Sequence, residues 1–590
     1  MRTIDADHHI ASTRAPGAGW TTLHAYVHDA AVADRLITEV VGPVGRAMER
    51  SGEISSQFFL RYWDGGPHVR WRLRDADDTV VARAAGALEE FLHGHAPASP
   101  VDPAVFLAGM GQPPEGSDWF GHGTVNRVDY EPETDRYGGP AALTLAEELF
   151  AVSSRLAESV VKGTVAGPQR VALALDLAHA LLAGADVDGP EAARFLRGFV
   201  LGWPTLAEAP NVDLDAARHA AERDLLTAPA AHAARREVVR RRVQEGTGAV
   251  GLWGAAVARY VRGLQALDSS GELTTPIPWV LGSQLHMMHN RLGLTISDEC
   301  HLSWLASFPY LGVDHSGGMH PPAPDAPDRV YHERSKFFPA RGAAQFPDPD
   351  APLHRNAVVG TGEIVQLPRP EPGGAGQVAL LSALLNRRSA YGRYHGQLTS
   401  GQLSTLLWYS AGDVDELRPP GAGPEDAYPV RPYPSAGARS ATRLLVQVAH
   451  IDGIPSGLYE YRPSGHALER VPVPTRTADL LRCSPFLDPD GQPTVDAVDA
   501  PAFLAVVADL AYPRQRYGLR SLRFQLLEAG HLTQNLLLVG AALGLRSVPL
   551  GGIYDDRLSL ALGLDGVDDA PLYLVPLGHE GWDPTEGDIA

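Results

Sequence analysis

Small residues at two places in the second half of the chain predict contact with a flat ring. Pro434, Ser435 and Ala436 form a small-residue turn, and Gly551 and Gly552 end a predicted strand. Glycines let backbone N–H groups approach a ring, and small hydroxyl side chains reach phosphate or ribityl oxygens. The pattern therefore indicates redox chemistry on a bound flavin.

A phosphate contact is predicted at the end of an apolar helical segment, where Arg387, Arg388 and Ser389 follow one another. Two arginines and a hydroxyl can hold a phosphate through charge-assisted hydrogen bonds. Such a run alone is more often surface charge at a helix end. The phosphate interpretation depends on its combination with the turn at 434–436 and with the glycine pair.

A second set of chemical groups lies in the first half of the chain, in the segment FFLRYWDGGPHVRWRLR at 58–74. Arg61, His68, Arg70 and Arg72 fall on a predicted hairpin, and strand alternation puts Arg70 and Arg72 on one face. Arginines that gather on one face of a sheet suggest an anion site. A solvated charged face is the alternative.

Two further motifs favour the anion site, YEPETDRYGG at 130–139 and LHMMHNRLG at 285–293. In the second motif, His286 and Asn290 are four residues apart, so they share one helical face. His286 and His289 have a spacing that could bridge a metal ion. We expect no metal, because we see no acidic or cysteine cluster to complete a ligand set.

Periodicity predicts the elements that position these residues. We expect a strand from Trp20, a helix at about 29–50, a strand hairpin in 58–74 with its turn at 64–67, helices over 140–265, and a helix at about 277–293. A chain of 590 residues is too long for one core. The proline- and glycine-rich stretch 309–327 predicts a linker between two domains, 18–308 and 328–590.

The composition argues against several classes of protein. A formal net charge of -20 argues against nonspecific nucleic-acid binding, which needs clustered lysine and arginine. The two cysteines are too few for a disulfide framework and fit a reducing cytosol. There is no signal-peptide pattern and no run of about 18 apolar residues, so we expect a cytoplasmic protein without a membrane span.

Residues 328–590 resemble the nitroreductase superfamily, and within it the FMN-dependent azoline dehydrogenases of SagB type. The motifs that carry the resemblance are RRS at 387–389, PSAGA at 434–438, GLYEY at 457–461, RYGLRSLRFQLLEAGH at 516–531 and PLGG at 549–552. The resemblance implies an α+β fold around a central antiparallel sheet. It also implies a homodimer with FMN at the subunit interface.

By this resemblance, the flavin is held from three places. Arg387 and Ser389 contact the FMN phosphate and ribityl chain, with Arg388 beside them. The turn at 434–436 meets the flavin, often from the second subunit. The backbone at 551–552 lies near the reactive flavin N5.

One residue pair departs from the family pattern, because several members have Lys-Tyr where this chain has Arg516-Tyr517. Azoline oxidation removes a proton from a ring carbon and delivers a hydride to the flavin, and a desolvated lysine can act as the base. An arginine effectively cannot, because its pKa exceeds about 12. We therefore expect Tyr517 to be the base, with Arg516 favouring its ionised form. The alternative is that Tyr517 packs and Arg516 faces solvent.

A long helix predicted at 522–540 carries an apolar face. We expect this face to be buried at a dimer core. Its members are Leu526, Leu527, Leu532, Leu536 and Leu537.

Residues 18–308 resemble the elimination domain of tRNA-dependent lantibiotic and thiopeptide dehydratases, through the motifs FFLRYWDGGPH, RYGG and H-x3-NRLG. Such a domain acts on a peptide serine or threonine esterified with glutamate. It removes the α-proton and expels glutamate, which leaves dehydroalanine or dehydrobutyrine. The resemblance also implies that a separate tRNA-dependent protein supplies the glutamyl ester.

Individual roles follow from the same resemblance. Arg61 and Arg136 match family arginines, and preorganised arginines stabilise developing anionic charge. His286 matches the family histidine, a proton shuttle near neutral pH. We expect His68, Arg70 and Arg291 to bind the peptide.

The two halves together resemble the bifunctional enzymes of lactazole-type thiopeptide pathways. Both would act on one ribosomal precursor peptide, whose azolines a separate cyclodehydratase would form. The alternatives are a dehydrogenase with a peptide-docking first domain, a general NAD(P)H-dependent nitro or quinone reductase, and a scaffold for other proteins.

Overall fold

The computed structural model of the chain describes residues 19–109, 118–163, 167–203, 212–312, 326–337, 362–418 and 427–580. The chain divides into two compact units, Met1–His315 and Ser316–Ala590. The helix α12 (Ile296–Leu311) carries Pro309 in its last turn, so the start of the predicted linker is helical. Most of the rest of that stretch lies outside the described residues.

The first unit begins with a four-stranded antiparallel sheet in the order β2-β3-β1-β4. Its strands are β1 (Trp20–Tyr26), β2 (Ser56–Tyr62), β3 (His68–Arg74) and β4 (Val125–Val128). The predicted hairpin is confirmed, with Tyr62 paired to His68. Its turn needs glycine at Gly65 and Gly66, whose φ angles of 69° and 110° lie in the left-handed region.

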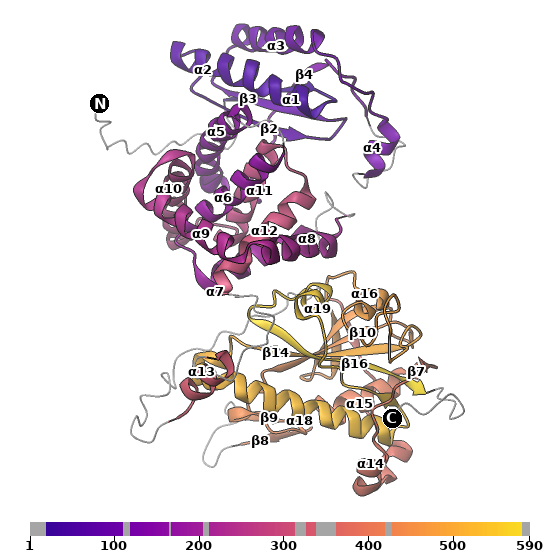
Figure 1. Ribbon diagram of the computed structural model, residues 1–590. Coiled ribbons are helices and arrows are strands. Elements are labelled where there is room, and N and C mark those ends of the chain that lie inside the picture. The colour runs from indigo at the N-terminus through magenta and orange to yellow at the C-terminus, as the bar shows by residue number, and fades with distance from the viewer. Residues whose placement is uncertain are drawn as a thin grey trace. The chain divides into compact units, whose positions relative to one another are not determined.

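Helices cover both sides of this sheet (Figure 1). Near the first strands lie α1 (Ala30–Leu36), a π-helical turn (Ile37–Val41), α2 (Gly42–Ser51) and α3 (Asp78–His93). The remaining helices before α12 are α4 (Pro103–Gly109), α5 (Pro140–Gly163), α6 (Pro168–Gly184), α7 (Gly189–Gly202), α8 (Leu214–Thr227), α9 (Pro229–Glu245), α10 (Gly248–Ser270) and α11 (Ile277–Leu292). Both α5 and α11 contact β2, and α12 packs on α7 and α8.

A tight connection between α11 and α12 sets the geometry of the site described below. Gly293 ends α11 with a φ of 75°, a left-handed conformation that favours glycine. Two residues later, Thr295 opens α12 with a capping box to Asp298. The last turns of α11 and the first turn of α12 are thereby brought side by side.

The second unit is built on an antiparallel sheet in the order β15-β16-β14-β10-β12-β13-β5, with β6 paired to β16. Its strands are β5 (Ile364–Gln366), β6 (Tyr394–His395), β10 (Thr442–Val448), β12 (Gly457–Arg462), β13 (Ala467–Arg470), β14 (Ala502–Asp509), β15 (Arg546–Ser547) and β16 (Asp569–Glu580). Two small separate sheets pair β7 (Leu398–Thr399) with β11 (Ile451–Asp452) and β8 (Asp415–Leu417) with β9 (Tyr428–Val430). The expected α+β class with a central antiparallel sheet is confirmed.

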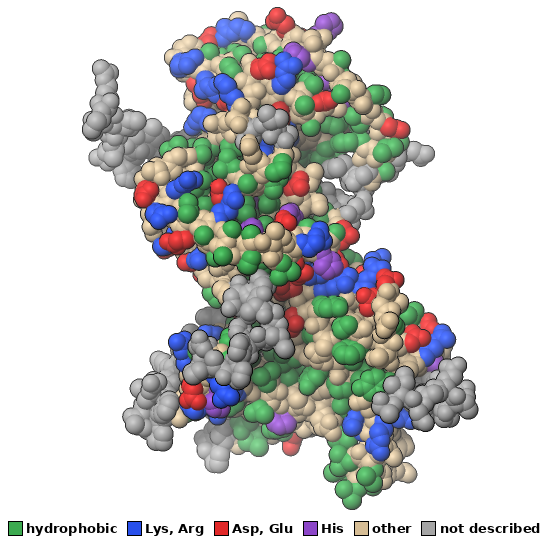
Figure 2. Space-filling view, in the orientation of Figure 1, with side chains coloured by type: hydrophobic (Ala, Val, Ile, Leu, Met, Phe, Trp, Pro, Cys, Tyr) green, Lys and Arg blue, Asp and Glu red, His purple; other side chains and the backbone are tan. Residues whose placement is uncertain are grey.

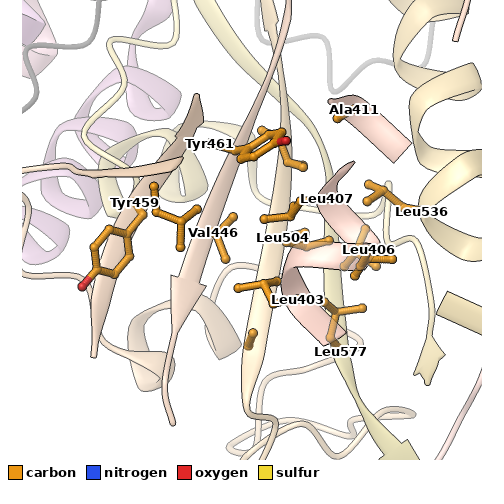
Figure 3. Close-up of a cluster of buried hydrophobic side chains, with 14 of the residues drawn as sticks. Leu403, Leu406, Leu407, Ala411, Val446, Tyr459, Tyr461, Leu504, Leu536 and Leu577 are labelled. Atoms are coloured by element: carbon orange, nitrogen blue, oxygen red, sulfur yellow. The ribbon is translucent and has the colours of Figure 1, made fainter. Parts of the chain in front are cut away.

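The central strands β10 and β14 are buried at every position, because helices and loops cover both faces of the sheet. On one face pack α15 (Ser400–Ala411) and α18 (Ser521–Ala542). Leu403, Leu406 and Leu407 of α15 meet sheet residues such as Val446 and Leu504 in the apolar cluster of Figure 3. The other helices of this unit are α13 (Pro327–Arg334), α14 (Leu380–Asn386), α16 (Thr477–Leu481), α17 (Arg514–Tyr517) and α19 (Asp555–Ala561), with short 3-10 turns at Gly373–Gln377, Ala436–Ala438 and Gly518–Arg520.

The leucines of α18 divide between two environments. Leu532, Leu536 and Leu537 are buried in the core of the unit, whereas Leu526 and Leu527 are 51% and 59% exposed. The predicted apolar face is therefore buried in the core only in its second half, at Leu532, Leu536 and Leu537, while the two leucines in the first half of the helix stay exposed. No helix in the described ranges has both the length and the apolar character needed to cross a membrane.

Candidate active sites

A cavity of about 1180 Å³ opens in the first unit between α7, α10 and α11. Most of its wall is apolar, formed by Phe195, Phe199, Trp203, Val261, Ile277 and Trp279. One part of the wall is polar and includes Arg136, Ser283 and His286. A large apolar cavity with a few convergent polar groups is the usual form of a small-molecule or peptide side-chain site.

Arg136 and His286 are two predicted catalytic residues that the fold brings to this cavity. Arg136 lies in the loop before α5, where its Nη1 pairs with Glu133 at 3.1 Å and its Nε donates to Ser283 Oγ at 3.5 Å. Ser283 and His286 are three residues apart on α11, so they share a face. The site therefore combines a cation with an imidazole in one cleft.

Glu299 of α12 completes this polar group, and the sequence analysis missed it. His286 Nδ1 lies 3.0 and 3.1 Å from the two oxygens of Glu299. Burial raises the pKa of Glu299 to about 7, although nearby His289 and Arg136 oppose that shift. The carboxyl therefore titrates in the range where imidazoles also titrate.

Glu299 escaped notice because an acid in the first turn of a helix normally serves the helix dipole. The available signal was its register, since Glu299, Leu302 and Ala306 follow the i, i+3, i+7 spacing of a buried stripe. An acid in such a stripe needs a buried partner. The sequence gives no means of naming that partner.

Arg61 lies in a buried ion cluster and does not line the cavity. Its Nη2 pairs with Asp34 at 2.6 Å, and Arg170 pairs with the other oxygen of Asp34 at 2.7 Å. The Asn290 side chain bonds both the N–H and the carbonyl of Arg61, at 2.9 and 2.8 Å. Arg61 therefore connects β2 to α1 and to the end of α11.

His68, Arg70 and Arg291 also have partners within the fold, and they too are absent from the cavity lining. His68 Nδ1 donates to the Gly66 carbonyl at 2.8 Å, and Nε2 accepts from Arg70 Nε at 3.0 Å. Burial lowers the pKa of His68 to about 4. The Arg70 guanidinium stacks 3.6 Å from the centre of the Tyr62 ring.

Arg291 is completely buried between α11, α5 and β2. Its Nε donates to the Phe59 carbonyl at 2.8 Å and to Ser154 Oγ at 3.0 Å, and Nη1 donates to the Met287 carbonyl at 3.0 Å. Burial lowers its pKa to about 9. Carbonyl and hydroxyl acceptors inside the fold therefore share the positive charge.

In the second unit, two of the predicted flavin contacts meet at one end of the sheet. Ser389, which follows Arg387 and Arg388, forms a parallel bridge with Ser547 of β15. Four residues later the chain reaches Gly551 and Gly552, whose backbones are exposed. The Gly552 carbonyl accepts from Ser484 Oγ at 2.6 Å, and Arg388 Nη1 donates to the Arg387 carbonyl at 2.9 Å.

The other predicted contacts form a second group around Tyr517. A Cβ atom added to Gly437 would lie 2.4 Å from the Tyr517 hydroxyl, so the turn that holds Pro434, Ser435 and Ala436 packs directly on that hydroxyl. Gly437 has a φ of 60°, and Ser435 Oγ accepts from the Ser440 N–H at 3.0 Å. The preceding residue, Arg516, is half-buried.

These residues suit a flavin mononucleotide. Ser389, next to Arg387 and Arg388, is bridged to Ser547, four residues before the exposed backbone of Gly551 and Gly552, so candidate phosphate groups and the glycine pair belong to the same edge of the sheet. Within the described part of the chain, no group of three or more His, Cys, Asp or Glu side chains is placed to hold a metal ion.

Two family models match the chain. The model for the C-terminal part of lantibiotic biosynthesis dehydratases matches residues 20–309, and the model for the nitroreductase family matches residues 384–579. A nitroreductase-family protein of Methanocaldococcus jannaschii is 27% identical over 216 residues, which are 37% of this chain and 96% of that protein.

Two solved structures are similar to larger parts of the chain. The pyridine synthase TbtD from thiomuracin biosynthesis aligns over 50% of this chain and 98% of its own, with 21% identity and a TM-score of 0.42. The tRNA-dependent lantibiotic dehydratase MibB from Microbispora sp. 107891 aligns over 51% of this chain and 29% of its own, with 21% identity and a TM-score of 0.32.

Proposed function

We propose, since the chain joins a lantibiotic dehydratase C-terminal domain to a nitroreductase-family domain, that it performs two reactions on one ribosomal precursor peptide. The first unit eliminates glutamate from glutamylated serine or threonine and leaves a dehydroamino acid. The second unit oxidises azolines to azoles with FMN. The meeting of Arg136 and His286 at the polar part of one large cavity is the observation that carries the first of these reactions.

The elimination uses groups that the cavity presents. His286 takes the α-proton of the esterified residue, and Arg136 stabilises the negative charge that develops as glutamate leaves. The apolar walls exclude water, which strengthens both interactions. Because Arg61, His68, Arg70 and Arg291 are held by partners of the fold, we assign them to positioning the sheet and α11.

The oxidation uses the groups around the glycine edge and the Gly437 turn. Bound FMN would accept the hydride that leaves the azoline ring. Arg387 and Ser389 would hold the phosphate and ribityl chain, and Tyr517 would take the proton from the ring carbon. Arg516, which precedes it in α17, would favour the ionised hydroxyl.

Partners of three kinds follow from these reactions. A separate tRNA-dependent protein makes the glutamyl ester, and a cyclodehydratase makes the azolines. The third partner is a second copy of the chain, supported by exposed leucines on α14 and α18, and Figure 2 shows hydrophobic side chains gathered over α14. FMN would then bind between the Gly437 turn of one copy and the Gly551 edge of the other.

Mass spectrometry of a precursor peptide tests both reactions at once. With the cyclising partner, each azole formed lowers the peptide mass by about 2 Da, because two hydrogens leave as a hydride and a proton. With the glutamylating partner, glutamyl esters disappear and dehydroamino acids accumulate. Rapid consumption of NADPH with a nitroarene, and no change in either peptide, would favour a general nitroreductase instead.

A further inference from the structure

The carboxyl group of Glu299 lies between two histidines of the neighbouring helix. Both of its oxygens are within 3.1 Å of His286 Nδ1, and one is 3.8 Å from His289 Nδ1, which is beyond hydrogen-bond reach. The Glu299 side chain is 1% exposed, whereas His286 is 12% exposed and lines the cavity. The buried Glu299 carboxyl thus contacts Nδ1 of His286, and the same imidazole ring forms part of the cavity wall.

Trp203 fixes the ring from another side. Its ring is edge-on to His286 with the ring centres 4.8 Å apart. Trp203 follows α7, and Glu299 lies in the first turn of α12, so contacts from two elements define the orientation of a side chain on a third. Such packing leaves the imidazole few alternative rotamers.

The charged groups that act on Glu299 come from several elements. They are His286 and His289 of α11, Arg136 of the loop before α5, and Asp298 of its own helix. Three further polar or charged groups on helices packed against α12 are held by other residues. Arg197 of α7 donates to Ser307, Arg218 of α8 pairs with Asp215, and His179 of α6 bonds Tyr310.

We propose that Glu299 is the positioning residue of the first reaction: it holds the proton of neutral His286 on Nδ1, so that Nε2 is the nitrogen that accepts the substrate proton. The inference rests on the proposed glutamate elimination. In the step, the Cα–H bond breaks and its proton goes to Nε2. Its electron pair forms the Cα=Cβ bond, and the Cβ–O bond breaks as glutamate leaves with the bonding pair.

The ionised form of Glu299 has two effects in this step. The carboxylate accepts a hydrogen bond from Nδ1–H while the His286 imidazole is neutral. It then stabilises the imidazolium that forms when Nε2 takes the substrate proton. A protonated Glu299 would instead donate to Nδ1 and leave the proton of His286 on Nε2, which cannot act as a base. Elimination should therefore increase with pH through about 7, where the Glu299 carboxyl ionises.

Glu299→Gln in the 590-residue chain removes the negative charge of the side chain and nearly preserves its shape. The amide is nearly isosteric, but it cannot be ionised and it can donate to Nδ1. We expect kcat for elimination from a glutamylated peptide to fall on the order of 10²–10⁴-fold with little change in KM, as for the loss of a carboxylate behind a catalytic histidine. Glu299→Asp should recover part of the rate, and the rise through neutral pH should be absent in the glutamine variant.

Glu158→Gln is the matched control, since Glu158 is a buried carboxylate of the same unit that pairs with Arg46 and does not line the cavity. It should retain elimination and the wild-type pH profile. An equal loss in both variants, or an unchanged kcat and pH profile in Glu299→Gln, would overturn the assignment.

A second measurement is independent of turnover. In protein labelled with ¹⁵N-histidine, the ring signals of His286, assigned by their loss in His286→Gln, report which nitrogen carries the proton. We expect the Nδ1–H form in the wild type at pH 8 and a shift toward the Nε2–H form in Glu299→Gln. An unchanged tautomer would overturn the inference even if elimination proceeds. If the wild type does not eliminate, the proposed function fails, while the tautomer still decides the role of Glu299.

Discussion

Two arginines of the first unit, Arg61 and Arg136, differ in whether their positive charge faces the cavity. Arg61 is balanced by Asp34 inside the fold, and Arg136 reaches the cavity wall beside His286. Both occur in motifs that resemble the same family. Only Arg136 stands where an anionic substrate group can meet it, so tertiary contacts separate two residues that the sequence treats alike.

The first prediction concerns the cavity pair. Arg136→Ala or His286→Ala should lower the rate of glutamate elimination on the order of 10²–10³-fold, because each removes a group that acts in the transition state. Glutamylated intermediates should accumulate, while azoles still form in the second unit. Mass spectrometry of the peptide products measures both outcomes, and equal loss of both reactions would indicate that the first unit only docks the peptide.

Tyr517 permits a similar separation in the second unit. Tyr517→Phe removes the hydroxyl that would act as the base and keeps the ring that packs edge-on against Phe524 at 5.1 Å. Azoline oxidation should decrease on the order of 10²-fold, whereas FMN content, measured by absorbance, should remain. If Tyr517→Phe oxidises azolines at the wild-type rate, Tyr517 is not the base and its role is to pack.

Short motifs singled out the hairpin arginines, the turn at 434–436 and the histidine of α11 as candidate site residues. The fold brings His286 to the cavity, whereas Arg61 and Arg70 are not part of its lining. Glu299 was missed because its partner lies 13 residues away, across a helix connection. Asp34, the carboxylate that pairs with Arg61, is 27 positions away on another element, so only the fold could show that the charge of Arg61 is already balanced.

At the scale of elements, the cluster of Asp34, Arg61 and Arg170 connects α1, β2 and α6. Asp34→Asn would leave two largely buried guanidinium groups without their carboxylate. Loss of one partner of a buried ion pair typically costs about 3–5 kcal/mol, so the first unit should unfold at a clearly lower temperature. Calorimetry would resolve this transition.

The exposed pair of Asp78 and Arg127 provides the comparison for that experiment. Their side chains are 88% and 55% exposed, and exposed pairs contribute about 0–1 kcal/mol. Asp78→Asn should therefore shift the transition little. If Asp34→Asn shifts it no more than Asp78→Asn does, the cluster does not stabilise the unit.

Exposed leucines of α14 and α18 are the main structural support for the proposed homodimer. Leu381 and Leu385 of α14 are 72% and 70% exposed, and α14 packs on α18, where Leu526 and Leu527 are also exposed. Apolar side chains that gather on a surface mark an interaction site. The sequence predicted the apolar helical segment before Arg387, but apolarity alone does not distinguish a core face from a subunit face.

Charge placed on α14 tests this surface. The double variant Leu381→Asp and Leu385→Asp should shift the protein from dimer to monomer in size-exclusion chromatography with light scattering, because two carboxylates would be buried without partners. FMN content should decrease with it, since the proposed flavin site uses both copies. Leu252→Asp, at a 59% exposed position of α10, should leave both unchanged. A monomeric wild type that retains FMN would contradict the proposal.

At the scale of the whole molecule, two units with separate cores carry two separate sets of chemical groups. The expected α+β class and the match of each half to its own family follow from motifs in each half. The advantage of the fusion cannot be read from either half alone. For the proposed pair of reactions it lies in the tether, which keeps a peptide bound at one site at an effective concentration of roughly mM near the other.

Separating the two activities onto different molecules tests the tether. A mixture of His286→Ala and Tyr517→Phe contains one working site of each kind, but not on the same chain. Above micromolar enzyme the mixture should form peptides with both modifications nearly as fast as the wild type. On dilution, the mixture should yield at least about 10-fold less doubly modified peptide than the wild type, because the second encounter becomes bimolecular.

Dimers that exchange subunits would carry both working sites, so the dilution series should be completed before exchange occurs. A constant ratio between mixture and wild type at every dilution would mean that the peptide leaves the enzyme between the reactions, and that the tether gives no kinetic advantage.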